Sequence, residues 1–142
     1  MIYIIGSLRN PEIPKLGKYL RDTTGIEMFE DWWSASEDAD EWWQHHENFK
    51  GRSYQQAING FHAQHDFDFD LVHLNRSDGG ILVLPAGRSG HLEFGYLMGQ
   101  GKKGYILFDE EPSRFDIMYR FANKGVFFTK EELGEQIKKD FA

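Results

Sequence analysis

The fold is decided by one stretch of the sequence, Gly80-Ile81-Leu82-Val83-Leu84-Pro85-Ala86-Gly87-Arg88-Ser89-Gly90. Its first part, residues 80–84, is continuous and apolar, which is typical of a strand buried on both faces of a parallel sheet. Residues 85–90 contain proline and glycine and predict a loop, and residues 91–100 predict a helix. A strand that leads through a short loop into a helix is the first part of a βαβ unit.

The same alternation of strand and helix recurs on both sides of this stretch. Strands are predicted at residues 2–5, 26–29, 105–108 and 126–128, and helices at 11–22, at 54–76 with a break near Gly60, at 114–122 and after Thr129, which forms a capping box with Glu132. Alternating elements imply right-handed crossovers. The sequence therefore predicts the α/β class: one doubly wound, flavodoxin- or Rossmann-like parallel sheet of about five strands, with helices on both faces.

Residues 1–142 are expected to form a single domain with an aromatic and acidic insert at about residues 31–50. The insert contains Trp32, Trp33, Trp42 and Trp43 and follows neither the helical nor the strand period, which predicts a loop or short helices. These tryptophans have two interpretations. They form a hydrophobic cluster or subunit interface, or they provide an aromatic wall on which a planar base stacks.

The charge and composition exclude several classes of function. The formal net charge of -7 disfavours binding to nucleic-acid backbones. The absence of cysteine excludes disulfides, thiolate catalysis and cysteine metal sites. The apolar run at the N-terminus is too short for a signal peptide or a membrane span. We therefore expect a cytoplasmic protein with no nucleic-acid and no membrane partner.

In a doubly wound fold, ligands bind beyond the carboxyl ends of the strands, so the candidate site is formed by the loops at residues 6–10, 30–49, 85–90 and 109–114. Glu93 lies in the first turn of the helix predicted at residues 91–100. An acidic residue in a first turn compensates the helix dipole. Alternatively, the glycine-rich loop presents this carboxylate at the mouth of the sheet, where it could attack an anomeric carbon.

Two other features carry weaker signals. Asp70 ends the alternation Asp66-Phe67-Asp68-Phe69-Asp70, which by pattern alone is typical of a solvated helix edge. His62 and His65 are three residues apart, as a pair of metal ligands on one helix face would be. No third ligand stands at a suitable spacing, so no metal site is predicted.

Four segments carry a resemblance to known enzymes. They are Tyr3-Ile4-Ile5-Gly6-Ser7, Asp70-Leu71 ahead of Ser77-Asp78, Gly90-His91-Leu92-Glu93-Phe94-Gly95-Tyr96 followed by Gly101-Lys102, and Phe115-Asp116-Ile117-Met118. In order and spacing they resemble the nucleoside 2-deoxyribosyltransferase family and its relatives, the 2'-deoxynucleoside 5'-monophosphate N-glycosidases. The third segment is the most specific of the four.

The resemblance implies that Glu93 is the nucleophile, that Asp70 assists departure of the base or grips the substrate, and that Tyr3 orients Glu93. The implied reaction passes through a covalent glycosyl-enzyme with retention at the sugar and needs no cofactor. The partner is a nucleoside or nucleotide. Residues expected to contact it are Gly6, Ser7, Arg9, Trp32, Gly87, Arg88, Ser89, Gly90, Asp116 and Met118.

The family places the residue that reaches the 5' end of the sugar near Asp116, often across a dimer interface. The resemblance therefore implies a homodimer or higher homo-oligomer in which Asp116 serves a neighbouring site. A carboxylate would repel a 5'-phosphate but accept a hydrogen bond from a 5'-hydroxyl, which favours a nucleoside and hence deoxyribosyl transfer.

Two alternatives remain beside the transferase. A monophosphate N-glycosidase is supported by residues that could cradle a phosphate, namely Ser7, Arg9, Arg88 and Ser89. Members of the transferase group can end in an aromatic residue whose carboxylate enters the site, whereas this chain ends Lys139-Asp140-Phe141-Ala142. The other alternative is a protein that binds a nucleoside or nucleotide without turnover.

Overall fold

The computed structural model describes all 142 residues and contains one sheet of five parallel strands. The strands are β1 (Ile2–Ile5), β2 (Met28–Phe29), β3 (Gly79–Val83), β4 (Lys103–Leu107) and β5 (Val126–Phe127). Their order is β2-β1-β3-β4-β5, and every neighbouring pair is parallel. This confirms the predicted doubly wound α/β fold.

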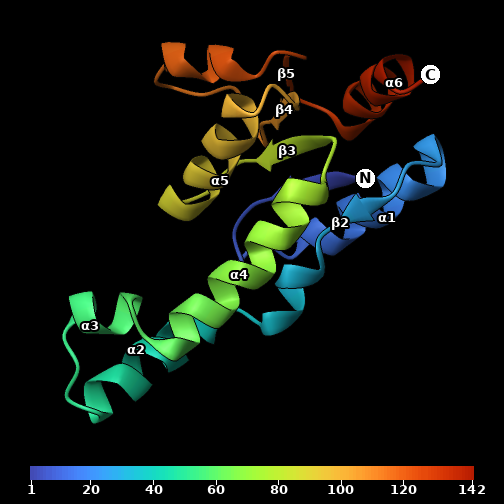
Figure 1. The fold of residues 1–142 in the computed structure, drawn as a ribbon. Coiled ribbons are helices and arrows are strands. Elements are labelled where there is room, and N and C mark those ends of the chain that lie inside the picture. The colour runs from blue at the N-terminus through green and yellow to red at the C-terminus, as the bar shows by residue number, and fades with distance from the viewer.

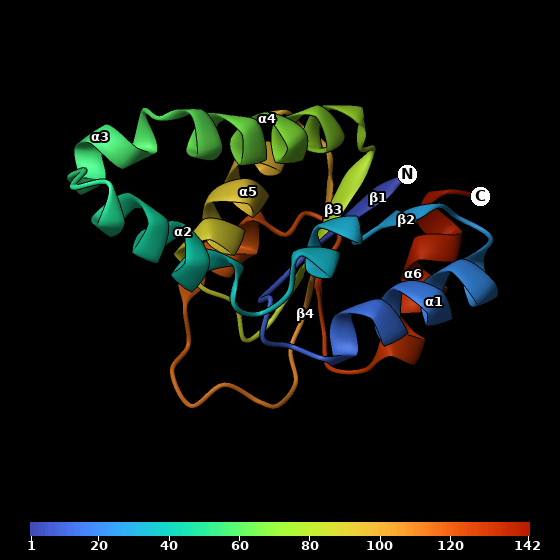
Figure 2. The same cartoon turned by 90° about the horizontal axis from the view of Figure 1, so that it is seen from below.

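Helices cover the sheet on both faces (Figures 1 and 2). On one face lie α1 (Glu12–Thr24) and α6 (Lys130–Asp140), and on the other lie α4 (Phe61–Arg76) and α5 (Arg88–Gly99). None of the helices combines the length and the apolar character needed to cross a membrane.

The side chains of β1 are divided between two cores, because successive residues of a strand point to opposite faces. Ile2 and Ile4 join the core under α1 and α6. Tyr3 and Ile5 join the core under α4 and α5. The position of Tyr3 in the strand therefore directs its side chain toward the α4 and α5 face.

Most element boundaries differ from the sequence prediction by one or two residues, and three differences change the description of an element. α5 begins at Arg88 rather than at residue 91, because Gly87 already has the extended backbone of an N-cap. Of residues 114–122, only Ile117–Phe121 form a helix, the 3-10 helix η2. The strand predicted at residues 26–29 is reduced to the edge strand β2, which pairs only with Ile2 and Tyr3.

One local prediction is confirmed in full and another in part. The helical region at residues 54–76 is broken before Phe61, giving α3 (Tyr54–Ile58) and α4. The Thr129 side chain caps α6 by accepting a hydrogen bond from the Glu132 backbone at 3.2 Å, but the reciprocal bond from the Thr129 backbone to the Glu132 side chain, which would complete the predicted capping box, is not formed.

The insert consists of short helices, one of the two structures predicted for it. They are the 3-10 helix η1 (Asp31–Ala35) and α2 (Ala39–Phe49). Together with α3 and the first half of α4, α2 forms an arm that leaves the sheet (Figures 1 and 2). Large apolar side chains are exposed along this arm, including Trp42 at 71% and Phe61 at 91%.

Two of the four tryptophans fasten the insert to the sheet. The Trp32 indole donates a hydrogen bond to the Ile4 carbonyl at 2.7 Å, and the Trp33 indole donates one to the Asn10 carbonyl at 2.9 Å. Both rings pack against the buried cores. These contacts support the interpretation of Trp32 and Trp33 as parts of a hydrophobic cluster.

Gly17 of α1 provides the first test of this packing. A Cβ atom there would lie 2.5 Å from the Oε1 atom of Glu30, whose carboxylate is buried and paired with Arg21 at 2.7 Å. We expect Gly17→Ala to lower the free energy of unfolding by roughly 1–3 kcal/mol, because the added methyl group would push the Glu30 carboxylate away from Arg21. Urea unfolding measures the change.

Gly134→Ala is the matched control, since Gly134 of α6 is also buried in a helix facing α1. There the nearest atom to an added Cβ is 3.7 Å away, so the variant should be as stable as the parent or more stable by up to about 1 kcal/mol. Equal stabilities of the two variants would contradict the close packing of α1 against Glu30.

Candidate functional site

The connections of the sheet define a crevice between β1 and β3. The chain leaves β1 for α1 on one face and leaves β3 for α5 on the other, so the two loops diverge at the carboxyl ends of these neighbouring strands. Such a switch point is where ligands bind in open α/β sheets. The residues singled out from the sequence lie on both sides of it.

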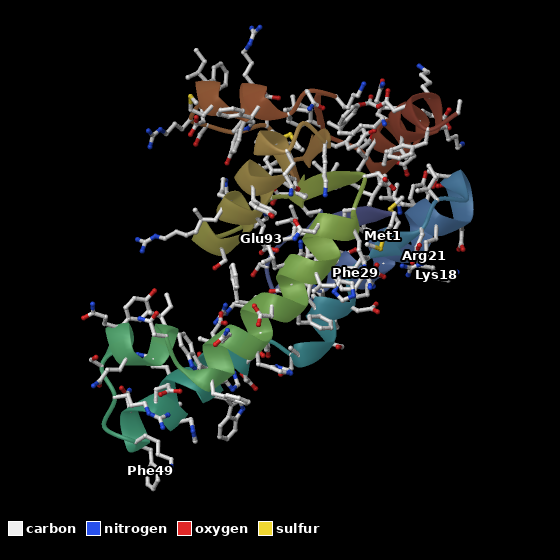
Figure 3. The ribbon with its side chains drawn as sticks, in the orientation of Figure 1. Met1, Lys18, Arg21, Phe29, Phe49 and Glu93 are labelled. Atoms are coloured by element: carbon white, nitrogen blue, oxygen red, sulfur yellow. The ribbon has the colours of Figure 1, made fainter.

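Tyr3, Asp70 and Glu93 come together on the α4 and α5 side. Tyr3 is buried in β1, and the two half-buried carboxyl groups belong to α4 and α5. The Tyr3 hydroxyl interacts with both carboxyl groups. Figure 3 shows Glu93 between α5, which carries it, and α4. Residues distant in the sequence thus form one cluster.

Burial makes both carboxyl groups harder to ionise. It raises the pKa of Glu93 to about 7, and repulsion from Asp70 adds to this effect. It raises the pKa of Asp70 to about 6, with a further contribution from Asp66. Hydrogen bonding to Tyr3 opposes both shifts. At neutral pH the two groups therefore hold a proton between them far more often than exposed carboxylates would.

The pKa of Tyr3 is raised, chiefly by burial and then by the nearby charges of Glu93 and Asp70. A phenol in this environment stays neutral and acts as a hydrogen-bond donor to whichever carboxylate is ionised. Tyr3 can therefore orient Glu93 but does not supply a charge.

Neither carboxyl group of the cluster has a cationic partner. The fully buried carboxylates elsewhere are paired, Glu30 with Arg21 at 2.7 Å and Glu47 with Arg52 at 3.0 Å. Buried charges are normally neutralised in this way. Two desolvated carboxyl groups with no arginine or lysine partner are typical of functional sites, where ionisation is tuned for chemistry.

Aromatic neighbours that the sequence analysis did not identify adjoin the cluster. The His73 ring stacks on the Phe29 ring, with centroids 4.0 Å apart and an angle of 9° between the planes. The centroids of the Phe29 and Tyr3 rings are 5.1 Å apart. His73 also acts to lower the pKa of Asp70. The spacing in the sequence could have indicated His73, because it is three residues after Asp70 and so lies on the same face of the helix.

The glycine turn before α5 has a different geometry from the one predicted. Because the helix begins at Arg88, Glu93 lies in its second turn, and the first turn contains no acidic residue. Compensation of the helix dipole, which is limited to the first turn, therefore does not explain Glu93. Gly90 is buried, and a Cβ atom there would lie 3.2 Å from Ile5, so a glycine lets α5 approach β1.

His91 links this turn to η2. Its Nδ1 atom lies 2.8 Å from the Gly87 carbonyl, and its Nε2 atom lies 2.9 Å from the Tyr119 hydroxyl. Since a carbonyl only accepts, Nδ1 donates there and Nε2 of the neutral ring accepts from Tyr119. No pattern in the sequence predicted this contact, which joins residues far apart in the chain.

A cavity of about 660 Å³ lies on the other side of the switch point. Of the residues expected to contact substrate, Ser7, Arg9 and Gly87 line it. Tyr3, Asp70 and Glu93 do not. The structure thus brings the predicted residues together as two groups, the carboxyl cluster facing α4 and α5 and the cavity facing α1 and α6.

The remaining predicted contacts are outside both groups. Arg88 and Ser89 are exposed at the start of α5. The Trp32 indole is bonded to the backbone of β1. The Asp116 carboxylate accepts a hydrogen bond from the Met118 backbone at 2.9 Å, and both residues are exposed. That Asp116 contributes to the site of a neighbouring subunit remains a prediction.

Gly6 lies at the end of β1, where an added Cβ atom would lie 2.7 Å from Ile13. No group of three or more histidine, aspartate or glutamate side chains is placed to hold a metal ion.

No protein-family model matches the chain, and no curated protein is similar to it in sequence.

The raised pKa of Glu93 leads to a prediction about stability. Ionisation is penalised in the folded state, so the penalty is absent below the unfolded pKa of 4.5 and complete above the folded pKa of about 7. We expect Glu93→Gln to raise the free energy of unfolding by roughly 2 kcal/mol at pH 8 and to change it little at pH 4. Urea unfolding at both pH values tests this.

Glu37→Gln is the control, since Glu37 is exposed. It should leave stability unchanged at both pH values. A loss of stability in Glu93→Gln at pH 8 would show that the Glu93 carboxylate is stabilised by the fold, contrary to the burial described above.

Proposed function

We propose that this protein cleaves or exchanges the N-glycosidic bond of 2'-deoxyribonucleosides through a covalent glycosyl-Glu93 intermediate, as a nucleoside 2-deoxyribosyltransferase. The observation that carries the proposal is the pair of cation-free carboxyl groups around Tyr3 at the switch point of the sheet. Two carboxyl groups are what a retaining glycosidic reaction requires, one as nucleophile and one as acid.

The first step forms a bond between a Glu93 oxygen and C1' of the deoxyribose. The C1'–N bond breaks, and its electron pair leaves with the base, which takes the proton from Asp70. In the second step the now ionised Asp70 takes a proton from an incoming base or a water molecule, which attacks C1' and releases Glu93. Two inversions at C1' give overall retention.

The raised pKa values keep one proton on the pair near neutrality. The reaction needs Glu93 ionised and Asp70 protonated, and because the pKa of Glu93 (about 7) lies above that of Asp70 (about 6), this arrangement is the less populated of the two singly protonated forms. The transition state carries positive charge on the sugar, which favours the ionised form of Glu93 as the reaction proceeds. Tyr3, as a neutral donor, orients the carboxylate without competing for the sugar.

A second candidate is hydrolysis of 2'-deoxynucleoside 5'-monophosphates. It is favoured by one feature, the free N–H groups at the start of α5, which has no side-chain cap and begins beside Ser7 and Arg9. A helix N-terminus attracts phosphate. Against it, the exposed Asp116 brings a carboxylate rather than a hydroxyl to its segment.

Substitution of the nucleophile is the direct test. With 2'-deoxyadenosine and a second free base, the parent should exchange bases, and Glu93→Ala should lower the rate by at least about a thousandfold. The Glu37→Gln control should keep parental activity. Liquid chromatography of nucleosides and free sugar measures both products.

Each outcome of that assay distinguishes between the candidate functions. Base exchange identifies a transferase and free deoxyribose identifies a hydrolase. In a parallel reaction with 2'-deoxyadenosine 5'-monophosphate, release of base from that substrate alone identifies the second candidate. Binding of the nucleoside without either product would leave a binding protein. Activity of Glu93→Ala within tenfold of the parent would remove Glu93 from the nucleophilic role.

The pH dependence tests the role of Asp70. In the parent, kcat/KM should follow a bell centred between pH 6 and 7, since Glu93 must be ionised and Asp70 protonated. Asp70→Asn should lower kcat/KM by about 10²–10⁴-fold and abolish the alkaline limb. An alkaline limb that persists in Asp70→Asn would assign the acid to another group.

A further inference from the structure

A series of aromatic rings leads from Tyr3 to the surface of α4 beside Asp70. The Tyr3 and Phe29 rings have centroids 5.1 Å apart, and Phe29 lies at the carboxyl end of β2, on the edge of the sheet where ligands bind. The centroid of the Phe69 ring is 6.1 Å from that of Phe29 and 4.6 Å from that of His73. Because the Tyr3 hydroxyl also interacts with Asp70, these rings adjoin the carboxyl cluster.

Phe69 is the member of this series that solvent reaches. It is 45% exposed, whereas Phe29 is buried beneath its neighbours. Phe69 directly precedes Asp70 in α4. An exposed aromatic surface beside a half-buried carboxyl group can accept a flat ligand that also reaches the carboxyl group.

His73 holds Phe69 in place. Its Nδ1 atom lies 2.8 Å from the Phe69 carbonyl oxygen, and since a carbonyl only accepts, Nδ1 donates the hydrogen bond. The His73 ring is in turn stacked on the buried Phe29 ring. The surface presented by Phe69 is therefore ordered before a ligand arrives, which lowers the entropy cost of binding.

The tryptophans of the insert are placed differently. Trp32 donates its indole N–H to the Ile4 carbonyl and packs against both cores. Trp42 is exposed on the arm that leaves the sheet (Figure 1). Phe69, in contrast, is linked by ring contacts to Tyr3 of the carboxyl cluster.

We propose that the base of the substrate stacks on Phe69, and that Phe69 is a specificity-determining residue of the carboxyl cluster. This inference rests on the proposed function, in which Asp70 gives its proton to the departing base. A base that receives this proton lies within hydrogen-bond reach of Asp70, and the ring of the preceding residue adjoins that position.

Stacking predicts the kind of base that is favoured. Every base has a flat face, so the surface at Phe69 accepts different bases. A purine has two fused rings and covers more of the phenylalanine face than the single ring of a pyrimidine does. Phe69 therefore contributes more to the binding of purine nucleosides.

Binding is tested by calorimetric titration of 2'-deoxyadenosine into Glu93→Gln, which cannot form the glycosyl intermediate. Adding Phe69→Leu should weaken binding by roughly fivefold or more, because leucine has no ring on which the base can stack. Adding Phe69→Tyr instead keeps the ring and should leave the affinity within about twofold. Thermal unfolding of each variant verifies that it is folded.

Phe61→Leu is the matched control. Phe61 is the first residue of α4 and is exposed. It precedes Asp70 by about two and a half helical turns and so lies on the opposite face of the helix. The control should leave the affinity for 2'-deoxyadenosine unchanged.

Steady-state base exchange gives a second measurement in the protein with Glu93 intact. Phe69→Leu should raise KM for 2'-deoxyadenosine by about fivefold or more and change kcat less than about threefold, because the base is stacked both before and during cleavage. The rise in KM should be smaller for thymidine, whose base is a pyrimidine. A general disturbance of the fold would not distinguish the two substrates.

Three results would overturn the proposal. They are the absence of 2'-deoxyadenosine binding to Glu93→Gln, equal affinities of the Phe69→Leu and Phe61→Leu variants, and an equal rise in KM for the two nucleosides. Failure of the proposed function gives a different result. A protein that neither exchanges nor releases the base, but whose 2'-deoxyadenosine binding depends on Phe69, would lose the catalytic role and keep the stacking surface.

Discussion

β1 and β3 pair in parallel with Tyr3 opposite Gly80 and Ile5 opposite Leu82, and the placement of the helices follows from that register. At Gly80 a side chain would meet Leu97 of α5 at 2.5 Å, so the absence of one allows α5 to lie close against β3. This close approach carries Glu93 over β1, to the face on which the alternation of the strand places Tyr3. The carboxyl cluster is thus a consequence of one strand pairing.

Burial of the carboxyl groups of this cluster lowers the stability of the fold. Elsewhere the protein neutralises its buried carboxylates with arginine, as in the pair of Glu30 with Arg21. Glu93 and Asp70 have no arginine or lysine partner and share the hydroxyl of Tyr3, and burial raises their pKa values to about 7 and about 6. Two buried carboxyl groups without an arginine or lysine partner lower the stability of the folded state. This unfavourable burial is the physical argument for the proposed catalytic role.

The switch point has two sides with different character. The α4 and α5 side is acidic and contains the rings of Phe29 and His73, whereas the α1 and α6 side has a cationic rim and a phenylalanine stack. The difference arises because the crossovers are right-handed, so connections that run in opposite directions along the sheet lie on opposite faces, and each side of the crevice is formed by different helices. One crevice therefore has two chemically different sides.

The sequence by itself determined the α/β class and the order of the elements, because apolar runs and glycine loops are readable along the chain. Through a resemblance to a known family it also gave the prediction that Glu93 is the nucleophile. It placed the break near Gly60 and the cap at Thr129 correctly, since both depend on neighbouring residues. Only the tertiary structure decided that Trp32 is bonded to β1, that α5 starts at Arg88, and that His73 and Phe29 border the cluster. These facts depend on contacts between segments distant in sequence, and such contacts exist only once the sheet has assembled.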